Sequence, residues 1–238
     1  MKRSSKSDLG PAIRAVPLMA ADNITIQLLT PKQRQQLLSI ATRIEYAKGQ
    51  VIYRRGATGA WLYFCQEGIV KTYRDLPSGR RRISAFLFAF DMFGLAEAGR
   101  YVNTAQAVTP VSCYRVEKEI LSAVLQQDAA LEYQFLCKLT HELRKGQRRA
   151  MMLGRRDAAG RFAMFLVMMR SHVPEGTPAN VIPLAMSRSD IAAFLGQSLE
   201  SISRASAVLT RRRLVQFSGR KMARVLDMPG LERLAADL

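Results

Sequence analysis

The stretch AMSRSDIAAFLGQSLESISRASAVLTRRR, residues 185–213, predicts two short helices joined by a tight turn. Ser187 is a good N-cap for the first helix, because its hydroxyl can accept a hydrogen bond from the first turn. Gly196 ends that helix and supplies the permissive backbone that a sharp turn between two helices needs. Ser198 is placed to cap the second helix. A helix-turn-helix is therefore the prediction from which the rest of the chain is interpreted.

The predicted second helix has one apolar and one polar face. Glu200, Ser203 and Arg204 are spaced i, i+3, i+4, so they project together from its first turns. Arginine can donate twice to guanine, a carboxylate can accept from the cytosine amino group, and serine can do either. This face suits the DNA major groove, although a solvated helical hairpin would show the same pattern. The residues expected to face a core are Ile202, Ala205, Val208 and Leu209.

The segment that follows favours DNA binding over an ordinary hairpin. Arg211, Arg212 and Arg213 come directly after the helix with no acidic residue among them. Two short apolar stretches then flank Ser218 and Gly219, which predicts a two-stranded wing. Helix, turn, helix, basic run and wing together indicate a winged DNA-binding domain.

Length and charge narrow the class of protein. The chain has 238 residues, 48% of them hydrophobic, and carries 36 Lys and Arg against 19 Asp and Glu, a formal net charge of +17. This charge implies a polyanionic partner, and double-stranded DNA is favoured over a membrane because no amphipathic anchor accompanies it. The longest apolar run, at 83–93, is far too short for a membrane span, and no signal peptide is recognisable. We expect a cytoplasmic protein.

The cysteines and histidines predict neither a metal site nor a disulfide framework. Cys65, Cys113 and Cys137 are widely separated, without the paired spacing that either would need. Cys137 and His141 can share a helical face, but two ligands are too few for a structural metal. No histidine occurs in 45–116, which argues against a cupin-like metal enzyme there. We expect no catalytic residue, no metal and no cofactor.

The first half of the chain predicts a loose basic arm at 1–30 and then a helix. Thr30 and Pro31 fit the N-cap and the first position of that helix. Its buried stripe is expected from Leu37, Leu38, Ala41 and Ile44.

From residue 45 the period becomes strand-like. Turns signalled by Gly49, Gly56, Gly68 and Gly79, with further strands at 84–93 and 104–116, predict a roughly eight-stranded roll. The residues expected to point into it are Val51, Tyr53, Leu62, Phe64 and Ile69.

A long helix is predicted at 128–156, with Leu131 and Phe135 packing on its own domain at the start. A seam follows with spacings of 3, 4, 3, 4 and 3, as in a coiled coil, which favours a parallel homodimer. The alternative is a single helix packed only on its own chain. The seam consists of Leu136, Leu139, Leu143, Gly146, Ala150 and Leu153. A basic run off the seam either attracts DNA or is a solvated face, and consists of Arg144, Lys145, Arg148, Arg149, Arg155 and Arg156.

These elements predict an α+β chain: an arm at 1–30, a β-roll sensor domain at 31–127, a dimerisation helix at 128–156 and a winged helix-turn-helix at 157–238. The last part should begin with a helix at 158–171, capped by Asp157, and end with a short helix begun by Pro229. The buried stripe of the helix at 158–171 is expected from Phe162, Phe165, Leu166 and Met169.

This order of parts resembles the catabolite-activator/FNR superfamily of bacterial transcription regulators, over roughly residues 30–238. The resemblance rests on Gly49, Gly56 and Gly68 in the roll, as in cyclic-nucleotide-binding folds, and on MSRSDIAAFLG followed by LESISR. The ESISR segment matches the E-x-x-S-R signature of the FNR and FixK branch. The resemblance implies a homodimeric transcription activator with RNA polymerase as its partner. It also implies that Glu200, Ser203 and Arg204 read a palindrome of TTGA-type half-sites. It also implies phosphate contacts from Ser187, Arg188, Ser189, Ser198 and Ser201.

The sensor residues depart from two known branches of this superfamily. Members that bind cyclic AMP hold its phosphate with Gly-Glu and Arg-Ser pairs, where this chain has Gly94-Leu95 and Asn103-Thr104, so the arginine fork is lost. FNR itself holds an iron–sulfur cluster on N-terminal cysteines, and no cysteine precedes Cys65 here. The FGLAEAG segment is close to the FGFEAG of the FixK group, which implies a regulator without a small effector. Most relatives turn on Gly-Asp where this chain has Phe90-Asp91.

Three other functions stay open at this point. In the first, a metabolite or haem bound in the roll sets the DNA affinity. The Cys137/His141 pair supports this hypothesis only weakly. A thiol of Cys113 or Cys137 can provide redox control. A purely architectural DNA protein would share the charge but would not discriminate between sequences.

Overall fold

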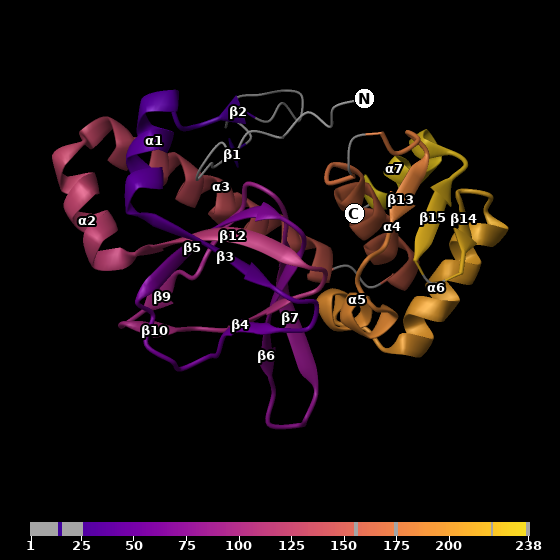
Figure 1. Ribbon diagram of the computed structural model, residues 1–238. Helices are drawn as coiled ribbons and strands as arrows, with labels where there is room; N and C mark the ends of the chain where they lie inside the picture. The colour runs from indigo at the N-terminus through magenta and orange to yellow at the C-terminus, as the bar shows by residue number, and fades with distance from the viewer. Residues whose placement is uncertain (1–13, 16–25, 155–156, 174–175, 220, 237–238) are drawn as a thin grey trace. The chain divides into compact units, whose positions relative to one another are not determined.

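The computed structural model describes residues 14–15, 26–154, 157–173, 176–219 and 221–236 (Figure 1). The chain divides into two compact units: Met1–Arg74 with Phe86–Lys145, and Asp75–Ala85 with Gly146–Leu238. The predicted α+β fold is confirmed. The arm expected at 1–30 lies mostly outside the described residues, but Arg14–Ala15 (β1) pairs antiparallel with Ile26–Gln27 (β2). Among the described helices, none has the length and hydropathy to cross a membrane.

The first helix, α1 (Pro31–Ile40), begins as predicted. The Thr30 hydroxyl accepts from the Gln33 backbone at 3.2 Å, and the Gln33 side chain accepts from the Thr30 backbone at 3.0 Å. The predicted buried stripe is wrong beyond Leu37, because Leu38 is 38% exposed and the helix ends at Ile40. The other two stripe residues belong to strand β3 (Ala41–Tyr46), whose pairing with strand β12 (Val111–Glu117) overrides the helical spacing.

The roll consists of two four-stranded sheets with the orders β4-β11-β6-β7 and β3-β12-β5-β8, in agreement with the predicted eight strands. A short ladder joins Ala96–Glu97 (β9) to Arg100–Tyr101 (β10). The predicted glycine turns have left-handed backbone, with φ of +83° at Gly49 and +91° at Gly68. The other strands are Val51–Tyr53 (β4), Trp61–Glu67 (β5), Val70–Asp75 (β6), Arg81–Leu87 (β7), Met92–Phe93 (β8), Thr104–Ala107 (β11) and Val111–Glu117 (β12).

Strand β5 is buried on both faces. The prediction that Leu62 and Phe64 point into the same interior as Tyr53 is therefore wrong. Tyr63 lies beside Tyr53, with ring centroids 5.7 Å apart, whereas Leu62 and Phe64 belong to a separate apolar cluster under the helices. Leu62 and Phe64 therefore do not share an interior with Tyr53. Alternation along a strand separates its two faces, but it does not say what covers each face.

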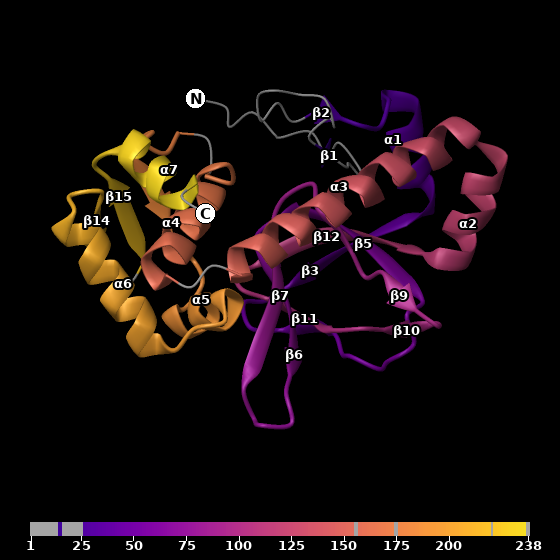
Figure 2. The same cartoon turned by 180° about the vertical axis from the view of Figure 1, so that it is seen from behind.

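Helices cover the β3-β12-β5 face of the roll, as both Figure 1 and Figure 2 show. The helix α2 (Lys118–Gln127) was not predicted, and α3 (Ala129–Gly154) follows it. Leu131 and Phe135 are buried at the start of α3 as predicted, and Phe135 meets Phe64 edge-on at 6.2 Å. This cluster docks the first part of α3 on the roll.

The second unit begins with α4 (Ala158–Arg170), where the Asp157 carboxylate caps the Gly160 backbone and the predicted stripe is buried. The helices α5 (Arg188–Leu195) and α6 (Leu199–Arg211) follow, and α7 (Met228–Ala236) contains Pro229 near its start. A three-stranded sheet has the order β13-β15-β14. Its strands are Val181–Pro183 (β13), Val215–Ser218 (β14) and Met222–Val225 (β15).

Candidate DNA interface

The predicted helix-turn-helix is present, with its caps where the sequence places them. The Ser187 hydroxyl accepts from the Asp190 backbone at 3.0 Å, and the Ser198 hydroxyl accepts from the Ser201 backbone at 3.1 Å. Gly196 ends α5 with φ +64°, the left-handed conformation that glycine adopts without strain. These local interactions fix where α6 starts.

Helix α6 is held by a fully buried apolar face. Ile202, Ala205 and Leu209 are each at most 2% exposed, whereas Val208, predicted to join them, is only half-buried. The opposite face presents Glu200, Ser203 and Arg204 to solvent. The structure therefore leaves the three predicted base-reading side chains together on one open surface.

Glu200 and Arg204 form an ion pair along this open face, with side chains 72% and 73% exposed. A carboxylate four residues before an arginine is a favourable helical pairing. The pair brings one acceptor group and one donor fork side by side at the N-terminal end of α6. Both groups carry the hydrogen-bonding capacity that base edges in a major groove require.

The residues predicted to contact phosphate gather at the N-termini of α5 and α6. The hydroxyls of Ser187 and Ser189 lie 2.8 Å apart, and those of Ser198 and Ser201 lie 2.9 Å apart. Free backbone N–H groups and the helix dipole make such termini favourable for anions. Each helix thus presents a pair of hydroxyls beside its positive end.

Arg188 is placed differently from the four serines. Its guanidinium lies over the Phe217 ring at 4.9 Å and over the Phe162 ring at 5.6 Å from the centroids. A cation above an aromatic face is stabilised by the ring quadrupole. Arg188 therefore packs β14 and α4 together, and a phosphate contact from it stays a prediction.

Two arginines contact the C-terminal end of α5: Arg161, which the sequence reasoning did not single out, and Arg149 of the predicted basic run. Arg161 donates to the Leu195 carbonyl at 3.3 Å, and Arg149 donates to the Phe194 carbonyl at 3.0 Å. Cations at this end complement the helix dipole and satisfy carbonyls that have no partner in the helix. The sequence signal available was only the presence of basic residues, which does not identify their acceptors.

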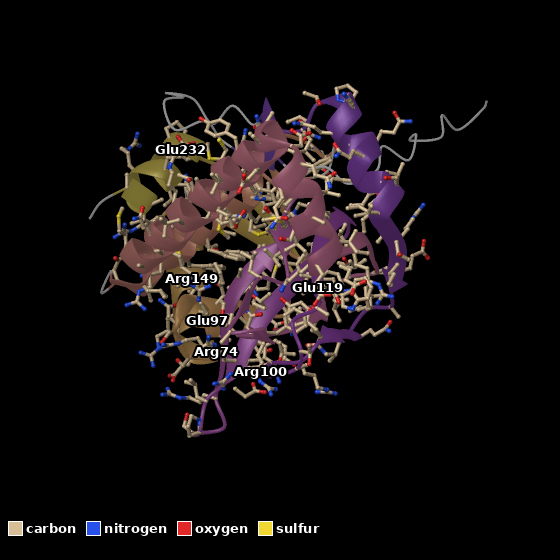
Figure 3. All side chains as sticks on the ribbon, turned by 90° about the vertical axis from the view of Figure 1, so that its left-hand side faces the viewer. Arg74, Glu97, Arg100, Glu119, Arg149 and Glu232 are labelled. Carbon is tan, nitrogen blue, oxygen red and sulfur yellow. The ribbon has the colours of Figure 1, made fainter. Side chains whose placement is uncertain are left out.

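Arg149, labelled in Figure 3, also donates to the carbonyls of Ile83 and Ser84 and stacks 4.3 Å from the Phe194 ring centroid. Burial, assisted by Arg82, lowers the pKa of Arg149 to about 10. This member of the predicted basic run is thus used inside the second unit rather than on a solvated face. Arg155 and Arg156 of the same run lie outside the described residues.

The predicted wing is present as β14 and β15, and its turn includes Gly219 with φ +61°. Arg211, Arg212 and Arg213 are exposed between α6 and the wing. Arg213 has φ +55°, an uncommon conformation for a residue with a Cβ, at the point where the chain turns from helix into strand.

The predicted dimer seam on α3 is apolar and open. Leu136, Leu139 and Leu143 are 55%, 39% and 64% exposed. Gly146 and Ala150 are also exposed, and Leu153 is half-buried. Large leucines in a row rarely face water without a partner surface.

The roll interior is lined by aromatic side chains. Tyr53, Tyr63, Phe93 and Tyr101 pack against one another there, with the Tyr53 and Tyr101 rings stacked 3.9 Å apart. Asn103, at one of the altered positions, accepts from the Tyr53 hydroxyl at 3.3 Å. The other altered position, Leu95, is apolar and 45% exposed. Neither position supplies the positive charge that a phosphate needs.

The two cysteines of the roll, Cys65 and Cys113, are buried and hold their thiols in the protonated form. Burial raises the pKa of Cys65, and burial also raises the pKa of Cys113 to about 12. A protonated, buried thiol is a poor nucleophile. In the described residues, no group of three or more His, Cys, Asp or Glu side chains is placed to hold a metal ion.

Comparison with known proteins agrees with this geometry. Residues 43–128 match the cyclic nucleotide-binding domain family, and residues 160–234 match the Crp-like helix-turn-helix domain. The structure of FixK2 from Bradyrhizobium japonicum superimposes with a TM-score of 0.77 at 30% identity, covering 84% of this chain and 99% of that one. The chain belongs to the CRP/FNR family of transcription regulators. As in that family, it is a DNA-binding regulator of FixK-like type.

Curated CRP/FNR relatives extend the similarity over most of the chain. The nitrogen fixation regulation protein FixK of Azorhizobium caulinodans is 29% identical over 202 residues, 84% of this chain and 82% of its own length. The transcriptional activatory protein AadR of Rhodopseudomonas palustris is 29% identical over 210 residues, 87% of each chain. These relatives are regulators rather than enzymes.

Proposed function

We propose that this regulator is a transcription activator that binds palindromic TTGA-type DNA as a homodimer. The observation that carries the proposal is the open face of α6, where Glu200, Ser203 and Arg204 stand exposed above a fully buried apolar face. A recognition helix needs this division, because the buried side fixes its position while the open side enters the groove.

The chemistry of the three side chains suits the proposed half-site. A TTGA half-site contains one G·C pair, which offers guanine acceptors to an arginine fork and a cytosine amino group to a carboxylate. Arg204 and Glu200 supply those two groups from adjacent turns, and Ser203 lies between them. The serine pairs at the starts of α5 and α6 are proposed to fix the register through phosphates.

The exposed leucines of α3 support the homodimer. A second copy would cover Leu136, Leu139 and Leu143 and would present a second α6. Dimers of helix-turn-helix proteins bind half-sites one helical turn, about 34–36 Å, apart. A palindrome is the DNA symmetry that such a pair matches.

We also propose that DNA binding needs no cyclic nucleotide, iron–sulfur cluster or other cofactor. The aromatic interior of the roll and the absence of a cysteine before Cys65 support this part of the proposal. RNA polymerase is the proposed protein partner, in line with the activator names of the relatives.

Fluorescence anisotropy with protein purified free of ligands tests the proposal. The probes are a palindromic TTGA duplex, the same duplex with both G·C pairs changed to A·T, and a scrambled duplex, all at one stated salt concentration. We expect tight binding to the first duplex only, with no change on adding cyclic AMP. Binding that appears only after an additive would favour an effector-dependent regulator, and equal binding to all three would favour an architectural protein.

Arg204→Ala is the informative variant. It should weaken binding to the TTGA duplex by about 1–3 kcal/mol while leaving scrambled DNA nearly unaffected, because a bidentate base contact is lost. Arg233→Ala is the matched control, since Arg233 is an exposed arginine on α7 of the same unit. Equal losses on both duplexes would show that Arg204 contacts phosphate alone.

A further inference from the structure

Beyond the apolar residues Leu131 and Phe135 at its start, the side of α3 that packs against the roll carries charged residues. Lys138 is fully buried, and its ammonium lies 3.4 Å from the Asp91 carboxylate and 2.9 Å from that of Glu142. Lys145 lies 2.9 Å from Asp91 and 3.4 Å from Glu142. Two carboxylates and two ammonium groups therefore form one network, here called the Asp91 cluster, which consists of Asp91, Lys138, Glu142 and Lys145.

The Asp91 carboxylate is itself rigidly placed. It accepts from the Phe88 backbone at 2.9 Å, and the Asp91 carbonyl accepts from the Cys65 backbone of β5 at 2.9 Å. The preceding residue, Phe90, has φ +73° and donates its backbone N–H to the Cys65 carbonyl at 2.8 Å. The left-handed turn at Phe90, hydrogen-bonded to β5, thus fixes the position of the Asp91 carboxylate with which Lys138 and Lys145 of α3 pair.

The cluster and the open leucines occupy different faces of the same helix. Residues 138, 142 and 145 follow one another at steps of four and three positions, which places them in one stripe along the helix. Residues 136, 139 and 143 follow at steps of three and four positions and form a second stripe. Each residue turns the helix by about 100°. A rotation by one residue would therefore break the ion pairs and turn the leucine stripe away from its present direction.

The charged contact restricts the rotation of α3 about its axis more strongly than apolar packing does. The apolar cluster around Leu131 and Phe135 holds the start of α3, but hydrophobic contact is not directional. Buried charges tolerate only the arrangement in which each finds its partner, because an uncompensated charge in the interior is strongly unfavourable. The four charges of the cluster sum to zero only while all of its members are in place.

We infer that Asp91 is a positioning residue for self-association: through Lys138 and Lys145 it fixes the rotation of α3 that points Leu136, Leu139 and Leu143 outward. This inference rests on the proposed homodimer, because it assigns a role to the face of α3 that lies beside the seam and packs on the roll. Phe90, which stands where most relatives have glycine, directly precedes Asp91 in the chain.

The test combines Asp91→Asn with a charge-compensated rescue. Asp91→Asn keeps the shape but leaves the cluster with one excess positive charge, and adding Lys145→Gln restores neutrality around Lys138 and Glu142. Asp75→Asn is the matched control, because Asp75 forms an ion pair with Arg81 at 2.8 Å with a side chain that is 55% exposed.

Two measurements are made on the full chain in a Cys137→Ser background. The first is the dimer dissociation constant by sedimentation equilibrium. The second is thiol cross-linking between copies through Leu143→Cys on the seam or Arg144→Cys beside it, which reports the rotation of α3 rather than its stability. Circular dichroism establishes that each variant is folded.

We expect Leu143→Cys to cross-link faster than Arg144→Cys in the parent and in Asp75→Asn. Asp91→Asn should raise the dimer dissociation constant about tenfold or more, since it breaks a buried pair, and should remove the preference for position 143. The compensated double variant should restore both. If Asp91→Asn does not fold, Lys145→Gln alone, at a site 33% exposed, should shift the cross-linking preference in the same direction.

Two results separate failure of the inference from failure of the proposed dimer. A seam that cross-links normally in Asp91→Asn, with an unchanged dissociation constant, would overturn the positioning role and leave the dimer intact. A parent protein that neither self-associates nor cross-links through position 143 would overturn both.

Discussion

Single residues of the roll depend on backbone conformations that few side chains tolerate. Gly68 joins β5 to β6 with φ +91°, and a Cβ built there would lie 2.2 Å from the Pro110 carbonyl oxygen. Gly79, in the next turn, has φ +74° but open space around it. The two glycines share a conformation and differ in how closely the backbone of another segment approaches.

This difference gives a stability prediction. Gly79→Ala should lower the free energy of unfolding by about 1 kcal/mol, the usual cost of a left-handed residue with a side chain. Gly68→Ala should cost about 3 kcal/mol or more, because the new methyl overlaps a backbone atom that cannot rotate away. Urea unfolding of both variants measures this, and equal losses would contradict the close approach to Pro110.

His141 gives a prediction on pH. Burial, with further contributions from Lys138 and Lys145, lowers the pKa of His141 to about 4, against an ordinary value of 6.5. Between these values the unfolded chain binds a proton that the folded chain does not, so the free energy of unfolding falls as the pH drops from 6.5 toward 4. The carboxylates of Glu142 and Asp91 act in the opposite direction without reversing the shift.

His141→Gln should therefore flatten the decline of stability across this window. Urea unfolding at pH 7 and at pH 5 provides the comparison. A variant that loses as much stability as the parent between these two values would show that His141 is not held in its neutral form. Asp91 does not titrate in this window, because the two lysines outweigh the effect of burial and lower its pKa below its ordinary value.

Among the helices, α6 is fixed both by an N-cap at its start and by a buried apolar face. The Ser198 hydroxyl caps its first turn, and three apolar residues dock it on the second unit. Because nucleation of a helix is costly, the cap contributes to where the open face of α6 begins.

Ser198→Ala should lower the free energy of unfolding by about 1 kcal/mol through loss of the cap. Ser203→Ala is the matched control on the same helix, since Ser203 is exposed on the open face. We expect Ser203→Ala to leave stability unchanged while reducing discrimination between the TTGA duplex and its G·C-altered form. Thermal unfolding and anisotropy separate the two effects, and equal stability of all three proteins would argue against the cap.

After Leu131 and Phe135, helix α3 turns charged residues toward the roll and large leucines toward solvent. An isolated surface helix normally has the reverse arrangement. The inversion is consistent with two contact surfaces, one on the roll through the Asp91 cluster and one proposed for a second copy through the leucines.

For the whole molecule, we expect DNA affinity to depend on the proposed dimer. Leu143→Arg places a charge in the seam at a side chain that is 64% exposed in the single chain, so the fold should be unaffected. Self-association should weaken strongly, and affinity for the palindrome should fall toward that for one half-site, because a monomer contacts only half of the phosphates and bases. Sedimentation equilibrium and anisotropy measure the two quantities.

Leu38→Arg is the control for this prediction, since Leu38 is a partly exposed leucine of α1, 38% exposed, outside the seam. It should leave both self-association and DNA binding at parental levels. If Leu143→Arg behaves like Leu38→Arg, the seam is not an interface.

The sequence by itself determined the features that depend on a few neighbouring residues. The glycine turns, the caps of Ser187 and Ser198, the polar face of α6 and the leucine spacing of α3 all follow from local backbone preference and helical period. These features were sufficient to predict the order of the parts and the family. The end of α1 was mispredicted, because strand pairing of Ala41 and Ile44 with β12 decided it.

Only the tertiary structure decided which groups meet across long separations. Lys138 reaches Asp91 from 47 positions away, Arg149 reaches Phe194 from 45, and Leu62 and Phe64 turn toward the helices instead of toward Tyr53. A basic run reads the same in sequence whether its charges face water or a buried carboxylate. Folding distinguishes the two, because burial strengthens each charge pair and makes every unpaired charge costly.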